Sequence, residues 1–188
     1  MAAVNQEFLA PFRAEAEKGL WPHEHSIAAG TVLYRFIDTT RSPPQVGADG
    51  PWWFEFEHFQ SIRHFSMRHG YSLGYSARLF AAILYEWSEA NAVVRAEVIA
   101  PLTAWKGRGK QIVVGKDRPL YKPELDPRDV NRICPGLITE SSQVAISKMT
   151  PMQGPNEVYQ MYIPGLGKPH RKFASYFKFL SCESIMTG

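Results

Sequence analysis

The residue with the most distinctive chemical setting is Arg35, which lies inside the apolar run from Thr31 to Ile37. A guanidinium is costly to bury unless it has an anionic partner, so an arginine in such a strand points to one. After a loop rich in proline and glycine, the chain returns to extended structure at Trp52-Trp53-Phe54. An arginine beside three large aromatic side chains predicts a pocket for a charged, ring-bearing ligand such as a nucleotide.

A second stretch of interest is the strand expected over residues 157–163, which carries Glu157 and Gln160. Its β-branched and aromatic residues favour extended structure. Because side chains alternate along a strand, Glu157 and Gln160 would point to opposite faces. We prefer Glu157 as the catalytic residue, since its carboxylate can stabilise a developing positive charge. Gln160 is the alternative.

Other polar groups carry weaker signals. The sequence Lys106-Gly107-Arg108-Gly109-Lys110 predicts a basic hairpin turn, whose glycines would let backbone N–H groups approach a phosphate. It lacks the spacing and the strand-to-helix context of a nucleotide-binding loop. His23 and His25 in an expected linker could hold a metal only with ligands from elsewhere, so no metal site is predicted.

Hydrophobic periodicity indicates both helices and strands. An apolar stripe with helical spacing predicts a buried helix over 75–90, and strict alternation predicts a strand over 92–99. The other expected elements are a helix within 4–19, a linker at 21–25, strands at 31–37, 52–56, 111–115 and 157–163, a loop over 38–51, helices at 58–69 and 126–134, an extended or helical run at 142–149, and a last strand within 172–180.

The length and composition are those of one globular domain. The 188 residues are 45% hydrophobic and 21% charged, with a net charge of +3 that is too balanced to indicate nucleic acid. We expect a single domain over 1–188, with an N-terminal helix and linker over 1–29 and a core over 30–188. The expected class is α+β, with mixed or antiparallel β-sheets that form a cleft flanked by helices.

The sequence also predicts the cellular compartment of the protein. It has no apolar run of the roughly 20 residues that a membrane span needs, and the first residues do not form a secretory signal peptide. The two cysteines, Cys134 and Cys182, are far apart and suit free thiols in a reducing compartment. We therefore expect a cytosolic protein, or one exported by a route that needs no cleaved signal.

The order of these elements resembles the ADP-ribosyltransferase-like fold, and above all the small members that act as NAD-cleaving bacterial toxins. The resemblance covers roughly residues 30–165. It is carried by Leu33-Tyr34-Arg35, by Gly50-Pro51-Trp52-Trp53-Phe54, by Val98-Ile99-Ala100-Pro101-Leu102, and by Glu157-Val158-Tyr159-Gln160-Met161-Tyr162-Ile163-Pro164.

The resemblance implies roles for the residues that match. Arg35 would grip NAD beside Tyr34, and an aromatic ring would stack on the nicotinamide. Glu157, or Gln160 in its place, would act at the nicotinamide ribose. The candidates for the aromatic ring are Trp53, Phe54 and Tyr75. NAD would be the substrate, with no resident cofactor.

One departure narrows the expected activity. No Ser-Thr-Ser triplet follows the second strand, where many arginine-type transferases have one. We therefore expect NAD hydrolysis or an atypical ADP-ribosyl transfer. The partners implied are a macromolecular acceptor, if the reaction is a transfer, and a cognate immunity protein in the producing cell.

The chemistry of this reaction explains the residue types. Breaking the nicotinamide–ribose bond builds an oxocarbenium-like cation, which a nearby carboxylate stabilises. A guanidinium makes paired hydrogen bonds to a pyrophosphate, and an aromatic face suits the cationic nicotinamide ring.

Two other readings of the sequence remain open. The first is an RNA-cleaving toxin in which His64, His69, Arg68 and Lys110 supply acid, base and phosphate clamp. The second is a binding module with an aromatic groove, which would turn over neither substrate.

Overall fold

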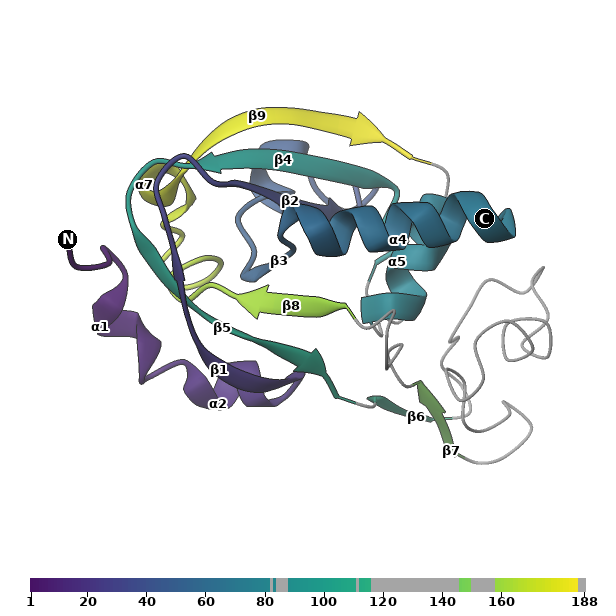
Figure 1. The fold of residues 1–188 in the computed structure, drawn as a ribbon, viewed down its shortest axis with the longest axis horizontal. Coiled ribbons are helices and arrows are strands. Elements are labelled where there is room, and N and C mark those ends of the chain that lie inside the picture. Colours follow the sequence, from purple (N-terminus) through teal and green to yellow (C-terminus); the bar gives the residue numbers. More distant parts are fainter. Residues whose placement is uncertain (82, 84–87, 111, 116–145, 150–157, 186–188) are drawn as a thin grey trace.

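Two antiparallel sheets form the frame of the protein in the computed structural model, which describes residues 1–81, 83, 88–110, 112–115, 146–149 and 158–185 (Figure 1). The larger has the strand order β1 (Leu20–Ile27), β5 (Leu102–Gly109), β8 (Tyr159–Tyr162), β3 (Trp52–Trp53). The second has the order β2 (Val32–Ile37), β4 (Ala92–Val98), β9 (Phe177–Ser184). A separate pair joins β6 (Ile112–Gly115) to β7 (Ile146–Met149). With its helices, the chain is α+β in class.

The two larger sheets are connected where β2 passes the residue that follows β3. The Tyr34 N–H donates to the Phe54 carbonyl over 2.9 Å, and the Phe54 N–H donates back to the Tyr34 carbonyl over 2.8 Å. Such a pair of bonds is one rung of an antiparallel ladder. It holds the strand that carries Arg35 beside the strand that carries Trp52.

The main core lies between these two sheets. Alternate residues of β4, including Val94, Ala96 and Val98, turn inward as the period of two predicts. Trp53 is fully buried there, and its indole stacks on Phe177 with ring centroids 4.8 Å apart.

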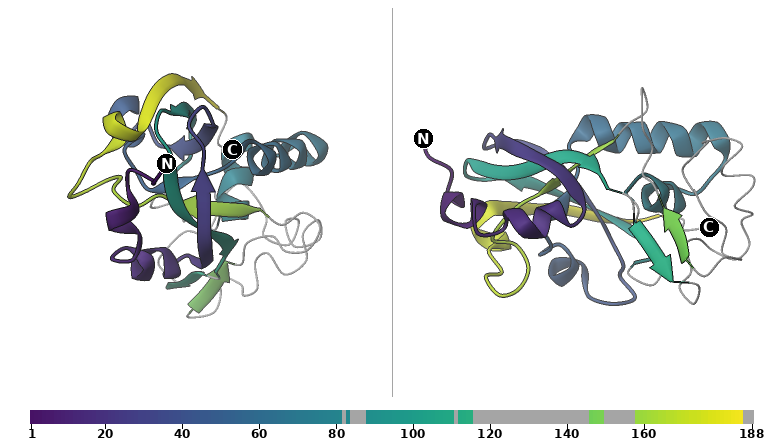
Figure 2. Two further views of the ribbon diagram at one scale, coloured as in Figure 1. Left: turned by 60° about the vertical axis from the view of Figure 1, so that its left-hand side comes forward. Right: turned by 90° about the horizontal axis from the view of Figure 1, so that it is seen from below.

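The helices cover the outer faces of the two sheets. The short helices α1 (Gln6–Leu9) and α2 (Arg13–Glu17) lie against the four-stranded sheet, where Leu9 and Ala16 pack on Trp105 and Tyr162. The longer α4 (Phe56–His69) packs with α5 (Leu73–Ala81) on the three-stranded sheet (Figure 2).

Helix α4 ends where the sequence predicts. Gly70 has a φ of +70°, the left-handed conformation that glycine adopts most readily at a helix C-terminus. The remaining short helices are α3 (Pro44–Gly47), within the loop after β2, and α7 (Phe173–Tyr176), which leads directly into β9.

The expected linker at 21–25 is wrong, because these residues belong to β1. All eight residues of β1 pair with β5, from Leu20 opposite Gly109 to Ile27 opposite Leu102. The predicted basic turn at 106–110 is wrong for the same reason, since 106–109 are the end of β5. A Cβ on Gly107 would lie 1.9 Å from the Trp21 carbonyl oxygen, so the glycine permits close strand pairing instead of a turn.

Other boundaries differ from the predictions. The helix expected over 75–90 is α5, which ends at Ala81; residues 88–90 are not helical, and 82 and 84–87 lie outside the described residues. The strand expected at 52–56 is only two residues long, because α4 begins at Phe56. The run at 142–149 contains β7, and the expected last strand within 172–180 is α7 followed by β9. The helix expected at 126–134 lies outside the described residues.

Among the described residues, no helix is both long enough and apolar enough to cross a membrane.

A buried amide makes three of the hydrogen bonds that fix the N-terminal segment to the sheets. The Asn5 side chain donates to the Thr103 carbonyl over 2.8 Å and to the Pro164 carbonyl over 3.1 Å, and it accepts the Thr103 N–H over 2.9 Å. Asn5 is completely buried. Its side chain therefore joins α1 to β5 and to the residues after β8.

We predict that Asn5→Ala lowers the free energy of unfolding by about 2–4 kcal/mol, because it leaves buried backbone groups without partners. Urea unfolding at neutral pH measures the change. The exposed neighbour substitution Glu7→Ala is the control, with an expected change within about 0.5 kcal/mol. Equal losses in the two variants would contradict the role given to Asn5.

Candidate functional site

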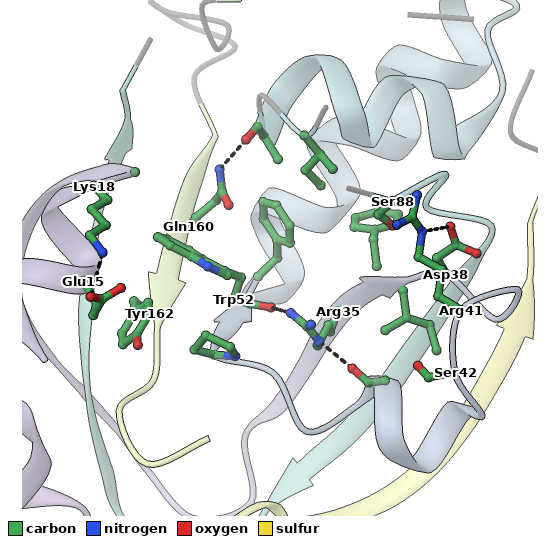
Figure 3. A pocket seen from close by; sticks show the side chains of 18 of the residues that line it. Glu15, Lys18, Arg35, Asp38, Arg41, Ser42, Trp52, Ser88, Gln160 and Tyr162 are labelled. Carbon is green, nitrogen blue, oxygen red and sulfur yellow. Dashed lines mark hydrogen bonds and ion pairs between the residues drawn. The ribbon is translucent and has the colours of Figure 1, made fainter. Parts of the chain in front are cut away.

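A cleft of about 590 Å³ opens between the edge of the three-stranded sheet and the β3–β8 side of the other sheet (Figure 3). Its volume lies within the range of small-molecule sites. One wall comes from β2 and the loop after it, and the other from α2, Trp52 and β8. Its lining residues include Glu15, Lys18, Arg35, Asp38, Arg41, Trp52, Phe54, Ser88, Lys110, Gln160 and Tyr162.

Arg35 is held in the cleft wall by backbone carbonyls. Its Nε donates to Gly47 O and its Nη1 to Trp52 O, each over 2.9 Å. Burial lowers the pKa of Arg35 to about 10, and the negative charge of Asp49 acts in the opposite direction. The guanidinium is therefore still a cation at neutral pH. The two bonds use only two of its five N–H donors.

Gly50 makes room for that guanidinium. A Cβ at this position would lie 2.0 Å from Arg35 Nη2. The glycine is thus required by the close approach of a charged side chain to the backbone. Arg35 and Gly50 together set the course of the loop between β2 and β3.

Asp38 organises the chain at the far end of β2. Its carboxylate accepts from the Thr40 N–H, the Arg41 Nε and the Glu89 N–H over 3.0, 3.2 and 3.0 Å. Burial raises the pKa of Asp38, but these donors outweigh it, and the pKa lies below its ordinary value. Asp38 therefore stays ionised and holds residues 88–91 beside the mouth of the cleft.

The opposite wall is aromatic and polar. The Trp52 and Tyr162 rings meet edge to face, with centroids 5.1 Å apart. Burial and the charge of Glu15 raise the pKa of Tyr162 to about 12, so its hydroxyl keeps its proton at neutral pH. The Gln160 amide nitrogen donates to Ala81 O over 3.3 Å. This wall offers an aromatic surface with hydrogen-bonding groups next to it.

Charged side chains stand at the two ends of the cleft in Figure 3. Lys18 pairs with Glu15 over 2.7 Å at one end, and Arg41 pairs with Asp38 over 3.2 Å at the other. The Lys18 side chain is 70% exposed and Glu15 is exposed too, so that pair contributes little to stability and Lys18 can turn towards an anionic ligand at small cost. Arg41 is 52% exposed, whereas its partner Asp38 is buried.

The structure brings three of the predicted site residues together and separates three others. Arg35, Phe54 and Gln160 line the cleft. Trp53 and Tyr75 are completely buried, so neither offers a free ring face. Trp53 stacks on Phe177 in the main core. Tyr34 stacks on Phe59 with ring centroids 4.3 Å apart, and both rings line a second cavity of about 460 Å³. Glu157 lies outside the described residues.

Residues 158–162 show why Gln160 faces the cleft. Gln160 and Tyr162 line it, whereas Met161 between them is fully buried in the main core. The alternation predicted for this strand is therefore present within β8. The strand begins at Tyr159, so the described part does not extend to Glu157.

The cleft also contains residues that were not among the candidates for individual roles. Trp52 was predicted as part of the aromatic wall, but Trp53 was chosen as the stacking ring; Trp52 lines the cleft, and Tyr162 lies beside it. Sequence could not decide between the two indoles, because the face of a two-residue strand depends on its pairing partner. Asp38 and Arg41, directly after an apolar strand, could have been found as a charged pair at a strand end.

The residues proposed for RNA cleavage do not all line the cleft. His64, Arg68 and His69 belong to α4, and no described residue of that helix lines the cleft. Lys110 does line it, and its Nζ lies 4.4 Å from the Trp21 ring centroid and donates to Glu17 O.

A second polar cluster lies outside the cleft, around Glu55. Its carboxylate binds His25 Nε2 over 2.5 Å and Lys106 Nζ over 2.9 Å. Burial raises the pKa of Glu55, but the hydrogen bonds and charges of Lys106 and His25 outweigh it, so the pKa is below its ordinary value. Glu55 is thus an ionised link between β1, β5 and the start of α4.

Glu55, Glu57 and His58 also place their donor atoms within 4.8 Å of one another, which is close enough to share a metal ion. The His58 Nδ1, however, accepts the Tyr159 N–H over 3.2 Å. A neutral imidazole with an accepting Nδ1 carries its proton on Nε2, so Nε2 has no lone pair for a metal. Lys106 on Glu55 adds a repelling charge. The cluster is therefore an ion-paired network.

Comparison with known proteins gives no relative: no protein family, curated protein or solved structure matches this chain.

We predict that Gly50→Ala lowers the free energy of unfolding by about 3 kcal/mol, because the new methyl displaces Arg35 from two charge-assisted hydrogen bonds. A double-mutant cycle with Arg35→Ala tests this through urea unfolding. In the Arg35→Ala background the glycine substitution should cost less than about 1 kcal/mol. Additive losses would show that Gly50 is not required by the guanidinium.

Proposed function

We propose that the protein cleaves NAD at the bond between nicotinamide and its ribose, and that its two sheets are those of an ADP-ribosyltransferase-like fold. The observation that carries the proposal is that Arg35 and Gln160, from strands far apart in the sequence, line one cleft with Trp52. Both residues belong to the motifs through which the sequence resembles that fold.

The electrostatics of the cleft suit a dinucleotide. Arg35 is a cation with donors left over from its two backbone bonds, and a guanidinium can pair with a pyrophosphate through two parallel hydrogen bonds. Arg41, largely exposed at one end of the cleft, is placed to meet a further phosphate oxygen. The volume of about 590 Å³ suits a ligand of this class better than a polymer.

The aromatic wall suits the other end of the substrate. We assign the ring that faces nicotinamide to Trp52 in place of Trp53, because Trp52 lines the cleft and Trp53 does not. The cationic nicotinamide ring of NAD is attracted to an aromatic face, most strongly to that of tryptophan. Phe54 and the protonated Tyr162 hydroxyl complete this wall.

The reaction needs stabilisation of positive charge on the ribose. As the C–N bond breaks, nicotinamide leaves with the bonding electrons and the ribose becomes oxocarbenium-like. For hydrolysis, a water oxygen bonds to the anomeric carbon and a proton is released. In this proposal Glu157 supplies the stabilising carboxylate, and Gln160, which lines the cleft, is the alternative, because only one of the two side chains can face the ribose from a regular strand.

Transfer to a macromolecular acceptor would use the same first step, with a nucleophile of the acceptor in place of water. A protein that depletes NAD in this way would also need a cognate immunity protein in the cell that makes it. Both partners follow from the family resemblance alone.

We predict that the purified chain releases free nicotinamide from NAD, measured by chromatography. Glu157→Gln should lower the rate by about 100-fold or more, because it removes the charge that stabilises the transition state. Arg35→Ala should lower it by at least about tenfold through lost pyrophosphate binding. Glu24→Gln, an exposed glutamate on β1, is the matched control and should have the wild-type rate.

Three outcomes would correct the proposal. No release of nicotinamide by the folded wild-type chain would contradict NAD cleavage. Metal-independent cleavage of RNA under the same conditions would favour the RNA-cleaving alternative. Full activity in Glu157→Gln with loss in Gln160→Ala would exchange the roles of these two residues.

A further inference from the structure

Among the described strands, none pairs with the start of β8 on the side where β3 lies. In an antiparallel strand, every second N–H points to the same side, so Tyr159, Met161 and Ile163 share one direction. The Ile163 N–H donates to Pro51 O over 2.8 Å, next to β3. Because β3 pairs only with Met161 and Tyr162, it stops short of Tyr159. The Tyr159 N–H therefore needs another acceptor.

His58, in the first turn of α4, supplies that acceptor. Its Nδ1 receives the Tyr159 N–H over 3.2 Å, and its ring stacks on the Tyr159 ring at 5.5 Å with planes 21° apart. The His58 side chain is only 15% exposed. The His58 imidazole thus accepts the hydrogen bond that β3 is too short to accept. The bond fixes the backbone of Tyr159, and the ring stacking fixes its side chain.

We propose that His58 is a positioning residue that holds the start of β8, and through it Gln160, in place for catalysis, and that protonation of His58 releases this hold. The inference rests on the function proposed above. Its reason is geometric: a protonated imidazole has N–H groups on both nitrogens, so Nδ1 can no longer accept from Tyr159. Gln160 is the next residue, with its side chain in the cleft.

The charges around His58 set the direction of the pH dependence. Burial is the largest effect and lowers the pKa of His58; the charges of Glu57 and Glu55 raise it, and that of Lys106 from β5 lowers it. His25 from β1 faces the cluster through Glu55. The folded-state pKa is below the unfolded value, so the stabilisation is complete above about pH 6.5 and is lost as the pH falls.

Two substitutions distinguish the effect of the His58–Tyr159 hydrogen bond from the effect of protonating His58. The amide oxygen of asparagine can take the place of Nδ1 and accept the Tyr159 N–H, but it does not titrate. His58→Asn should therefore keep the hold on β8 at every pH. His58→Ala removes the acceptor and the ring together. His64→Asn, an exposed histidine on the same helix, is the matched control.

The test combines two readouts on the full chain. The first is the pH titration of the Tyr159 backbone amide and the His58 imidazole by nuclear magnetic resonance. The second is the pH profile of nicotinamide release. In the wild type, the Tyr159 amide signal, the His58 imidazole signal and the rate of nicotinamide release should share one midpoint below about pH 6.5. His58→Asn should remove that transition from both readouts, and His64→Asn should leave it unchanged. His58→Ala should lower kcat by about tenfold or more with a smaller change in KM.

The results distinguish this inference from the proposed function. A Tyr159 amide that does not follow the His58 titration, or an acid loss of activity that persists in His58→Asn, would overturn the positioning role while NAD cleavage stands. If the wild type releases no nicotinamide although the Tyr159 amide follows His58, the proposed function fails, and the catalytic part of the inference fails with it.

Discussion

The partly buried guanidinium of Arg35 is the constraint on which the shape of the cleft depends. A cation in a cleft wall must recover the hydration that it loses, and Arg35 does so through the carbonyls of Gly47 and Trp52. Those carbonyls come from α3 and β3, so the two bonds fix the segment from Gly47 to Trp52 against β2. Burial lowers the pKa of Arg35 and the negative charge of Asp49 acts against it, with burial the larger effect. The function proposed for this cation is to bind an anionic ligand.

The second feature that creates the cleft is the limited backbone pairing between the two sheets. Among the described residues, one bridge joins them, between Tyr34 and Phe54, and the main core packs their facing sides together. On the other side of the bridge, Trp52 and β8 face the end of β2 across the cleft. The N-terminal helices close this side, because Asn5 ties them to β5 and Ala16 packs beside Trp105 and Tyr162.

The sequence predicted the elements in which local pattern and tertiary structure agree. Alternation identified β4, and the apolar run identified β2 with Arg35 in it. It could not predict β1, because Trp21-Pro22-His23 carries no alternation and forms a strand only by pairing with β5. Nor could it choose between Trp52 and Trp53, since the face of each indole is decided by the pairing of β3 with Met161 and Tyr162. The hold of His58 on Tyr159 joins residues that no local pattern connects.

The residues that line the cleft depend on backbone contacts rather than on a motif with fixed spacing. Arg35 is placed by a loop, Trp52 by a two-residue strand and Gln160 by a strand whose first N–H is bonded to a helix.

The most direct test of the central claim, that NAD binds between Arg35 and β8, is amide hydrogen–deuterium exchange of the Glu157→Gln variant with and without NAD. The account predicts slower exchange on NAD addition in the loop between β2 and β3 and at the start of β8, with no change along the exposed face of α4. Unchanged exchange at saturating NAD, or protection confined to α4, would contradict it.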